Sequence, residues 1–353
     1  MISLTSAQNC LSKIKVKASQ LDRDSVALEL GLKQLGNHSL LALKVPVSLG
    51  GAGFNKSDYG LWQIELARYS GALAFLQTQH QSAGSFLTNS ENKILQQEYL
   101  PSMATGDTLV GVGFSQLRRP GKPLITAEAT EKGYLISGVV PWITGGNIFD
   151  DFIIGAVLDD GRELYGMLPL RNSKQSSGGE IKISSPMDLI AMSATNTVNA
   201  ELDNWYLDRD RVVTIKPAQS IHRSSKKNVL NHAWFPLGCA YAALDIIEQT
   251  YQRKQLGFIK DAQKSLKTEV EIYKQRVLRA TTSETATYPD KLQLRGQAIE
   301  TAFRCAQAAV ISSSGAANNL GSDAGRVYRE ALVFSVSGQT TDVMEASLSP
   351  LVK

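Results

Sequence analysis

The spacing of apolar residues divides the chain into three regions, and the first reads as helical. Apolar positions recur every three or four residues there, as in the stretch that Ser57 can cap and in which Trp62, Leu66 and Tyr69 share one face. The next segment, GALAFLQTQHQSAGSFL, is typical of a buried helix, because its small residues permit close packing. We therefore predict a helical domain over residues 1–108.

In the middle region the period changes towards two. The stretch GYLISGVVPWIT is rich in β-branched and aromatic residues, and TNTVNAELDNWYL alternates between apolar and polar positions. DDFIIGAVLDDGRELYGMLPL places two apolar runs around Asp160-Gly161, which is a strong hairpin signal. This pattern predicts a β domain over residues 109–212, a small barrel or sandwich.

The helical period returns in the last region, where four long amphipathic helices are expected. Such a set predicts an antiparallel four-helix bundle over residues 213–353 and completes a fold of the α+β class. The fourth helix begins near Val327, and the apolar faces of the first three contain Trp234, Leu237, Tyr241 and Leu244; Leu266, Val270, Tyr273 and Val277; and Ile299, Phe303, Ala306 and Val310.

One interruption stands out in the last of these helices. Residues 328–348, YREALVFSVSGQTTDVMEASL, read as a helix that pauses at Ser337-Gly338-Gln339-Thr340 and continues. A glycine and three small polar residues reduce helix stability, which raises the question of what residue would normally stand at position 338.

Composition excludes several classes of function. The chain has 353 residues, 43% of them hydrophobic and 20% charged, with a net charge of +4, which is ordinary for a globular protein and too low for a nucleic-acid binder. Cys10, Cys239 and Cys305 form no CxxC pair and do not combine with the four histidines at metal-ligand spacing, so we expect no metal site and a reducing compartment. No signal peptide and no apolar stretch of about 18 residues is present, which favours a cytoplasmic protein without a membrane span.

Five motifs in the same order resemble those of the acyl-CoA dehydrogenase superfamily of flavoproteins. They are LALKVPVSLGGAGF, ENKILQQEYLPSMATGD, GYLISGVVPWITGGN, YQRKQLG and RVYREALVFSVSGQTT, and together they extend along nearly the whole chain. The resemblance implies a flavin-dependent oxidoreductase that acts on a small molecule such as an acyl-CoA or acyl-carrier thioester. It also implies FAD, with FMN as the alternative, and a homodimer or homotetramer.

The resemblance assigns the flavin ring to residues at one strand end and in a neighbouring loop. Trp142 can cover the ring, and the hydroxyl groups of Thr144 and Ser115 can form hydrogen bonds with it, with Ile143 between them. The simpler alternative is a core tryptophan followed by a strand-favouring threonine.

A second set of residues matches the diphosphate and adenosine part of FAD. Arg253 matches an arginine that reaches the flavin pyrophosphate of a neighbouring subunit, and Gln255 belongs to the same motif. Arg253 can instead complement the dipole of its own helix. In SSSGAANN only Gly315 remains of a glycine-rich loop, and Thr340 matches the threonine of a Tyr-Glu-Gly-Thr turn.

The chain departs from this family at the catalytic base. The dehydrogenases use a carboxylate to remove the proton next to the thioester carbonyl, and in one branch that carboxylate belongs to the Tyr-Glu-Gly-Thr turn. Gly338 falls on this glutamate without a gap. In the other branch the base position corresponds to Asn228 or, with a shift of one residue, Val229. Asp342 and Glu345 are nearby carboxylates for which a solvated helix face is the alternative.

Three functions remain open without that base. They are a dehydrogenase-like oxidoreductase whose base comes from elsewhere, a flavin-dependent monooxygenase of the same fold, and a non-catalytic flavin- or acyl-binding protein. His80 and His232 are the histidines considered for the monooxygenase, with a packed core residue as the alternative for His80. Arg118 and Arg119, in SQLRRPGKP, can grip a phosphate or form an ordinary basic loop.

Overall fold

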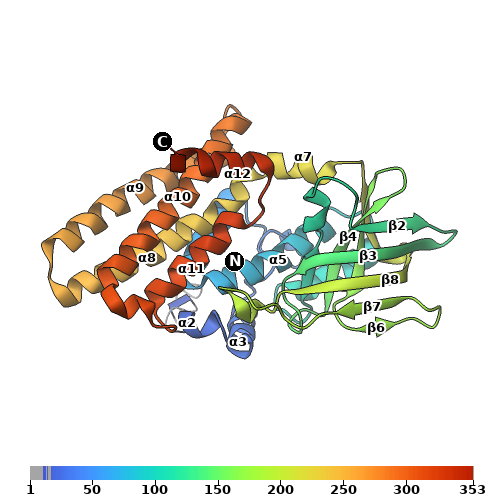
Figure 1. The fold of residues 1–353 in the computed structure, drawn as a ribbon. Coiled ribbons are helices and arrows are strands. Elements are labelled where there is room, and N and C mark those ends of the chain that lie inside the picture. The colour runs from blue at the N-terminus through green and yellow to red at the C-terminus, as the bar shows by residue number, and fades with distance from the viewer. Residues whose placement is uncertain (1–10, 13, 15–16, 353) are drawn as a thin grey trace.

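A computed structural model describes residues 11–352 except 13, 15 and 16, so Cys10 lies outside the described residues. The order of elements is helices, then strands, then helices (Figure 1). This confirms the predicted α+β architecture with a helical region, a sheet region and a helical bundle. Cys239 and Cys305 are buried free thiols.

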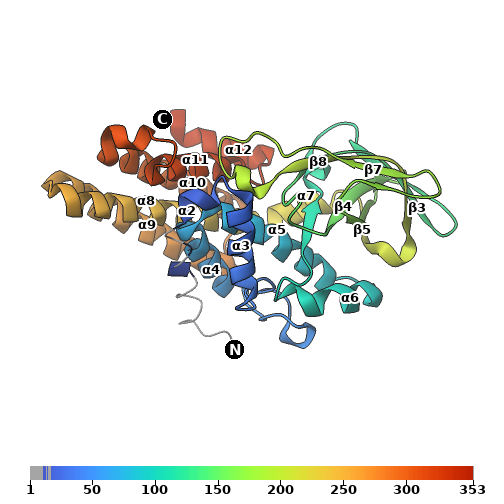
Figure 2. The same cartoon turned by 90° about the horizontal axis from the view of Figure 1, so that it is seen from below.

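The N-terminal region is helical, and aspartate, asparagine or serine side chains cap α3, α4, α5 and α6. Asp24 caps one helix by accepting from the backbone N–H groups of Val26 and Ala27. Asn55 rather than the predicted Ser57 caps another, and Ser57 lies inside it. The helices are α2 (Ala18–Leu21), α3 (Ser25–Gly36), α4 (Lys56–Tyr69), α5 (Gly71–Thr88) and α6 (Lys93–Met103). Figure 2 shows α3 and α6 on the same side of the molecule.

The middle region forms one connected sheet. Its strand order is β6-β7-β8-β3-β2-β4-β5-β9, with β1 paired to β4. Asp160 and Gly161 lie in the turn between β4 and β5, where Gly161 has a φ of +83°, so the predicted hairpin is confirmed. The strands are β1 (Val110–Gly113), β2 (Ile125–Ala129), β3 (Gly133–Ile143), β4 (Asp151–Leu158), β5 (Glu163–Pro169), β6 (Ser173–Lys174), β7 (Glu180–Ile183), β8 (Val198–Asp208) and β9 (Val212–Lys216).

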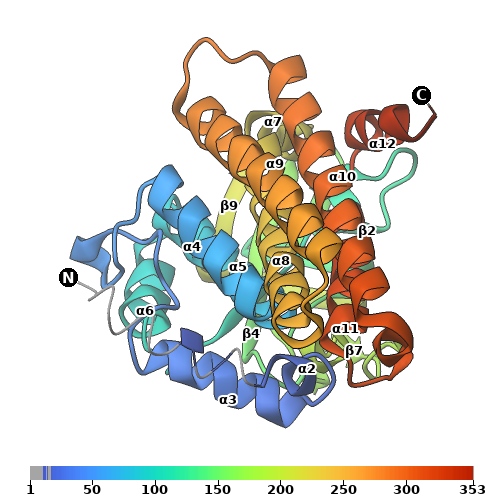
Figure 3. The ribbon, with the colours of Figure 1, turned by 90° about the vertical axis from the view of Figure 1, so that its left-hand side faces the viewer.

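The C-terminal region contains the four predicted long helices. They are α8 (Trp234–Lys254), α9 (Gly257–Thr282), α10 (Tyr288–Ser313) and α11 (Asp323–Val336). Thr287 and Asp290 form a reciprocal capping box at the start of α10. Figure 3 shows α8 in the middle of the bundle, with α4 and α5 of the N-terminal region beside it, and α4 packs against α8.

Shorter helices connect these parts. α7 (Ser220–Lys227) lies between the sheet and the bundle at the top of Figure 1. The short 3-10 helices are η1 (Val47–Leu49), η2 (Ser115–Arg118), η3 (Ser193–Thr195), η4 (Arg209–Arg211), η5 (Val229–His232), η6 (Ser314–Asn318) and η7 (Ser349–Val352).

The predicted pause is a break between two helices. α11 ends at Val336, and α12 (Thr341–Leu348) begins after Thr340, whose side chain accepts a hydrogen bond from the backbone N–H of Val343. Gly338 has a φ of +60°, a left-handed conformation that side chains other than glycine rarely adopt. The glycine is therefore required by the backbone of the break.

A buried ion pair joins the N-terminal region to the bundle. Arg326 donates to Glu330 at 2.7 Å within α11, and the same carboxylate accepts from the backbone N–H of Gly71 at 3.2 Å. A β-carbon on Gly71 would stand 2.6 Å from the carboxyl carbon of Glu330, so only glycine permits this approach. The pair fixes the start of α5 against α11.

Two classes of feature are absent from the described residues. No helix in this part of the chain combines the length and apolar character needed to cross a membrane. Nor do its histidine, cysteine and acidic side chains gather in a group of three that is suited to hold a metal ion.

Candidate functional site

A cleft with two adjoining cavities lies where the N-terminal helices, the sheet and the bundle meet. The larger cavity has a volume of about 510 Å³ and the smaller about 220 Å³, the size range of small-molecule sites. Both are lined by Lys44, Arg118, His232 and Gly338, so they are two parts of one cleft.

The structure brings three of the predicted flavin residues to the smaller cavity. Trp142, at the end of β3, leaves 52% of its surface exposed there, which is unusual for a tryptophan in a strand. Ser115, in η2, and Thr144, directly after β3, line the same cavity. Ile143 is fully buried in the core and pairs with Val198 of β8, so its side chain only anchors the strand end.

A buried polar group faces this cavity without a partner. Gln63 of α4 lines it, and its side-chain nitrogen donates to the hydroxyl of Tyr59 and to Oε1 of Gln77. Its Oε1 has no hydrogen-bond partner among the described residues. Because an unsatisfied buried acceptor costs free energy, this atom is suited to accept a hydrogen bond from a ligand.

The imidazole of His232 fills the space that a side chain at residue 338 would occupy. A β-carbon on Gly338 would stand 2.5 Å from Nε2 of His232 and 2.7 Å from Cε1. Nδ1 of the ring lies 3.3 Å from Oγ of Ser337. The resemblance assigns a glutamate to residue 338. The space that its side chain would fill is occupied by the ring of His232, which comes from a distant part of the sequence.

The surroundings of His232 keep its ring neutral. Burial lowers the pKa of His232 well below its usual value, and the positive charges of Arg295 and Arg118 lower it further. A neutral imidazole has one nitrogen with a free lone pair. His232 is therefore a group in this cleft that is able to accept a proton.

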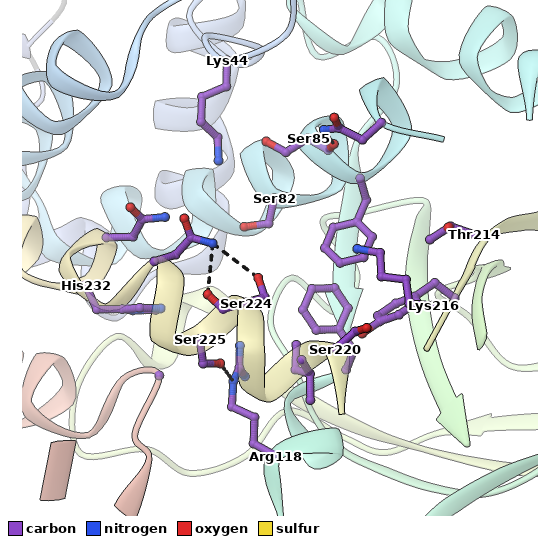
Figure 4. A pocket seen from close by; sticks show the side chains of 18 of the residues that line it. Lys44, Ser82, Ser85, Arg118, Thr214, Lys216, Ser220, Ser224, Ser225 and His232 are labelled. Atoms are coloured by element: carbon purple, nitrogen blue, oxygen red, sulfur yellow. Dashed lines mark hydrogen bonds between the residues drawn. The ribbon is translucent and has the colours of Figure 1, made fainter. Parts of the chain in front are cut away.

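The remaining titratable groups of the larger cavity are cationic or phenolic. Lys44, Arg118, Lys216 and Arg295 line it, and no aspartate or glutamate does so among the described lining residues. Burial lowers the pKa of Lys44 to about 8. Figure 4 shows Lys44, Arg118 and Lys216 extending into the cavity from three different sides.

The carboxylates considered from the sequence lie elsewhere. Asp342 accepts from the hydroxyl of Tyr288 at 2.7 Å, and Glu345 is exposed; neither lines the cleft. Asn228 does line the larger cavity, but its amide donates to Ser224 and cannot serve as a base. Val229 is buried.

His80 has a structural position. It is fully buried in α5, its Nδ1 accepts from the backbone N–H of Val110 at 3.0 Å, and its Nε2 donates to the carbonyl of Met103 at 3.0 Å. Both ring nitrogens are used, and His80 lines neither cavity. The core interpretation of this residue fits the structure.

Arg253, Gln255 and Gly315 lie at the opposite end of the bundle, whereas Thr340 of the same predicted set lies in the break beside Gly338. Arg253 and Gln255 are exposed at the C-terminal end of α8, and Lys254 between them donates to Oγ of Ser314, next to Gly315. Phe235 lines the cleft at the other end of α8, about 27 Å away at 1.5 Å per residue. Within one chain Arg253 and Gln255 are thus separate from Trp142.

Sequence reasoning missed Lys44 and Arg295. Arg295 left a signal, since it occupies a position in the apolar stripe of its helix with Ile299 and Ala302, where a charge is unexpected. Lys44 also left a signal, because it is the one charge in the apolar run LLALKVPV.

Comparisons with known proteins agree on the kind of fold. Residues 3–107 match the family model described as acyl-CoA dehydrogenase, N-terminal domain. An acyl-CoA dehydrogenase from Bacillus subtilis is 27% identical over 240 residues, which are 64% of this chain and 61% of that protein. The chain therefore aligns with about three fifths of this relative's length.

Solved structures share the fold over the whole chain. Butyryl-CoA dehydrogenase from Megasphaera elsdenii superimposes with a TM-score of 0.78 at 16% identity, covering 100% of both chains. KijD3, solved in complex with FMN and a dTDP-linked sugar, gives a TM-score of 0.76 at 16% identity, covering 99% of this chain and 93% of that one.

Proposed function

The chain belongs to the acyl-CoA dehydrogenase-like superfamily, and from this premise we propose that it is a flavin-dependent oxidoreductase that removes hydrogen from an acyl thioester. In this proposal His232 replaces the missing carboxylate as the proton acceptor. The observation that carries the proposal is the contact between His232 and Gly338 inside the cleft that Trp142 lines.

The residues of the smaller cavity fit a flavin. The exposed face of Trp142 offers a flat apolar surface for an aromatic ring, and the hydroxyl groups of Ser115 and Thr144 offer hydrogen bonds to its heteroatoms. The unpartnered Oε1 of Gln63 fits an N–H donor such as the flavin carries. A flavin bound there supplies the acceptor for the hydride that leaves the substrate.

His232 is placed to take the accompanying proton. We assign the hydrogen of the neutral ring to Nδ1, where it donates to Oγ of Ser337, because this leaves the lone pair of Nε2 free. Nε2 is the ring atom closest to Gly338. The substrate carbon next to the thioester carbonyl loses its proton to Nε2, and Arg118 and Arg295 favour the return of the ring to its neutral form.

We further propose FAD as the flavin and a homo-oligomer as the active assembly. Arg253 and Gln255 are exposed and lie about 27 Å along α8 from the cleft, so a ligand beside Trp142 meets them in another copy of the chain. Release of the flavin and its chromatography against FAD and FMN tests the identity, and sedimentation tests the assembly.

One observation favours a monooxygenase as the second candidate. The described lining residues of the cleft include no carboxylate, and a monooxygenase needs no base for the α-proton. The two candidates differ in their need for oxygen.

The deciding experiment is reduction of the purified protein by acyl-CoA without oxygen. The proposal predicts that the flavin absorbance near about 450 nm is lost when butyryl-CoA is added anaerobically. No loss with any of a panel of acyl-CoA thioesters, together with oxygen consumption by the chemically reduced protein and one of them, would favour the monooxygenase.

A further inference from the structure

The larger cavity is built for negative charge. Four cationic side chains line it from four different parts of the chain: Lys44 before η1, Arg118 in η2, Lys216 at the end of β9, and Arg295 in α10. Hydroxyl and amide groups make up much of the rest of its lining, such as Ser82, Ser220 and Asn231. A cavity of this kind is costly to keep empty of anions, because its charges repel one another.

Arg118 has no carboxylate partner. Its Nε donates to Oγ of Ser225 at 3.0 Å, and the ion pairs of the described residues do not include it. Glu163 attracts Arg118, but its carboxylate accepts from the hydroxyl of Tyr165 at 2.8 Å and from the backbone N–H of Ile221 at 3.1 Å. The guanidinium of Arg118 therefore retains donors for a ligand.

Arg295 is the more unusual of the two, because it is only 2% exposed. Its Nη2 donates to the carbonyl groups of Ser337 at 2.7 Å and Gly338 at 3.2 Å, and its Nη1 donates to the carbonyl of Val229 at 3.5 Å. Its Nε is buried without a partner in the described part of the chain. Burial and the charge of Arg118 lower the pKa of Arg295 to about 10. A buried arginine without a counter-charge is destabilising, and an arriving anion relieves this cost.

We propose that Arg118 and Arg295 together bind an oxyanion of the substrate, and that this oxyanion is a carboxylate on the acyl group. Arg118 is suited to this task, since its Nη1 and Nη2 can present parallel N–H donors to a carboxylate, and the unpartnered Nε of Arg295 can add a third. The substrate class is then an acyl thioester whose acyl chain ends in a carboxylate. This inference rests on the proposed function, because it takes the cleft to be the thioester site.

The position of Arg295 favours the acyl group over the carrier as the source of the anion. Arg295 donates to the carbonyl of Gly338, and the ring of His232 fills the space that a β-carbon on Gly338 would need, so an anion at Arg295 is close to the proposed proton acceptor. The phosphates of a CoA or carrier protein are separated from the thioester by the whole pantetheine arm. Only a charge within the acyl group reaches both sites.

Binding of two matched thioesters tests the inference. Succinyl-CoA and butyryl-CoA have acyl chains of four carbons and differ in a terminal carboxylate. Their affinities are measured calorimetrically without oxygen on the purified protein with its flavin chemically reduced, because a reduced flavin accepts no hydride and turnover is prevented. We expect at least about 10-fold tighter binding of succinyl-CoA, since hydrogen bonds to charged groups contribute about 1.5–3 kcal/mol. Equal or weaker binding of succinyl-CoA would overturn the inference.

Variants assign the effect to the two arginines. Arg118→Gln and Arg295→Gln are each expected to lower the ratio of the two affinities by about 10-fold or more, whereas the exposed neighbour Arg119→Gln keeps it. If Arg295→Gln does not fold, Arg295→Lys is used instead. It retains the charge but loses the planar guanidinium, so the ratio of the two affinities is expected to fall less than in Arg295→Gln. A ratio unchanged in both Arg118→Gln and the Arg295 variant would overturn the assignment.

Small anions separate the failure of this inference from that of the proposed function. Succinate and inorganic phosphate are tested for a rise in melting temperature that Arg118→Gln abolishes. A rise with succinate but no binding of either thioester supports the anion site and contradicts the thioester function. A rise with phosphate alone, with equal affinities for the two thioesters, means that the site holds a phosphate and overturns the carboxylate assignment.

Discussion

Nε2 of His232 lies 2.5 Å from the point at which a β-carbon on Gly338 would stand. The two residues belong to η5 and to the break between α11 and α12, and the ring of one fits against the bare backbone of the other. The absence of a side chain at residue 338 therefore leaves the space that the ring of His232 occupies.

The first prediction concerns turnover. His232→Asn keeps a polar side chain of similar size but removes the proton acceptor, so anaerobic reduction of the flavin by a thioester should slow by about 100-fold or more. The flavin content should not change, because Trp142, Ser115 and Thr144 are untouched. Stopped-flow absorbance measures the rate, and His222→Asn in α7 is the matched control. A rate equal to that of the parent would exclude His232 as the base.

The second prediction concerns the space shared by residues 232 and 338. Gly338→Glu should destabilise the protein by about 2–5 kcal/mol, since it strains a left-handed backbone and overpacks His232. The double variant His232→Ala, Gly338→Glu should recover the overpacking share of this loss, about 1–3 kcal/mol. Chemical denaturation measures both.

The same double variant also tests the register of the sequence resemblance. If Gly338 stands where the family has its base, the glutamate of the double variant should restore thioester oxidation that His232→Ala alone has lost. A double variant that is no more stable than Gly338→Glu would show that the ring of His232 and the new glutamate do not compete for one space.

The third prediction concerns pH. Burial lowers the pKa of both His232 and His80, and Arg118 and Arg295 add to the effect at His232. Below about pH 6.5 the unfolded chain binds protons that these two folded histidines do not, so the free energy of unfolding should decrease as the pH falls, by at most about 1.4 kcal/mol per pH unit for each histidine. Above about pH 6.5 the two neutral histidines make their full contribution to the free energy of unfolding.

Denaturation curves between pH 7.5 and pH 5 test this dependence, roughly spanning the range in which a histidine titrates. His232→Asn should flatten the slope relative to the parent, with His222→Asn as the control. An identical slope for the parent and His232→Asn would mean that folding does not lower the pKa of His232.

The fourth prediction concerns the buried pair that joins α5 to α11. Arg326→Met leaves Glu330 without its partner and should cost about 3–5 kcal/mol of unfolding free energy. The exposed pair of Arg304 and Glu269 is the control, since Arg304→Met should cost less than about 1 kcal/mol. Equal costs would show that Glu330 accepts a proton or rearranges when Arg326 is lost.

The elements were predictable from the sequence where the signal is local. The faces of α8 to α11, the turn at Asp160-Gly161 and the break at Gly338 each depend on residues within a few turns of one another, and all are present. The cap of α4 was displaced by two residues, because Asn55 and Ser57 are both good capping residues and only the backbone geometry decides between them.

The site was predictable only in part, because it is made by contacts between distant residues. His232 and Ser337 are 105 residues apart, and no local pattern places them together. Arg118 and Arg295 likewise belong to distant elements, η2 and α10, and line one cavity only in the folded chain. Trp142 and Thr144 were found because they follow one another at a strand end, where a single motif includes both.

The measurement that tests the central claim most directly is an anaerobic titration of the purified protein and of His232→Asn with succinyl-CoA and butyryl-CoA, followed by flavin absorbance. We predict that one of these thioesters bleaches the flavin of the parent, and that the variant binds the same thioester but bleaches at least about 100-fold more slowly. Bleaching at the same rate in both proteins would contradict the account, as would a purified protein that carries no flavin.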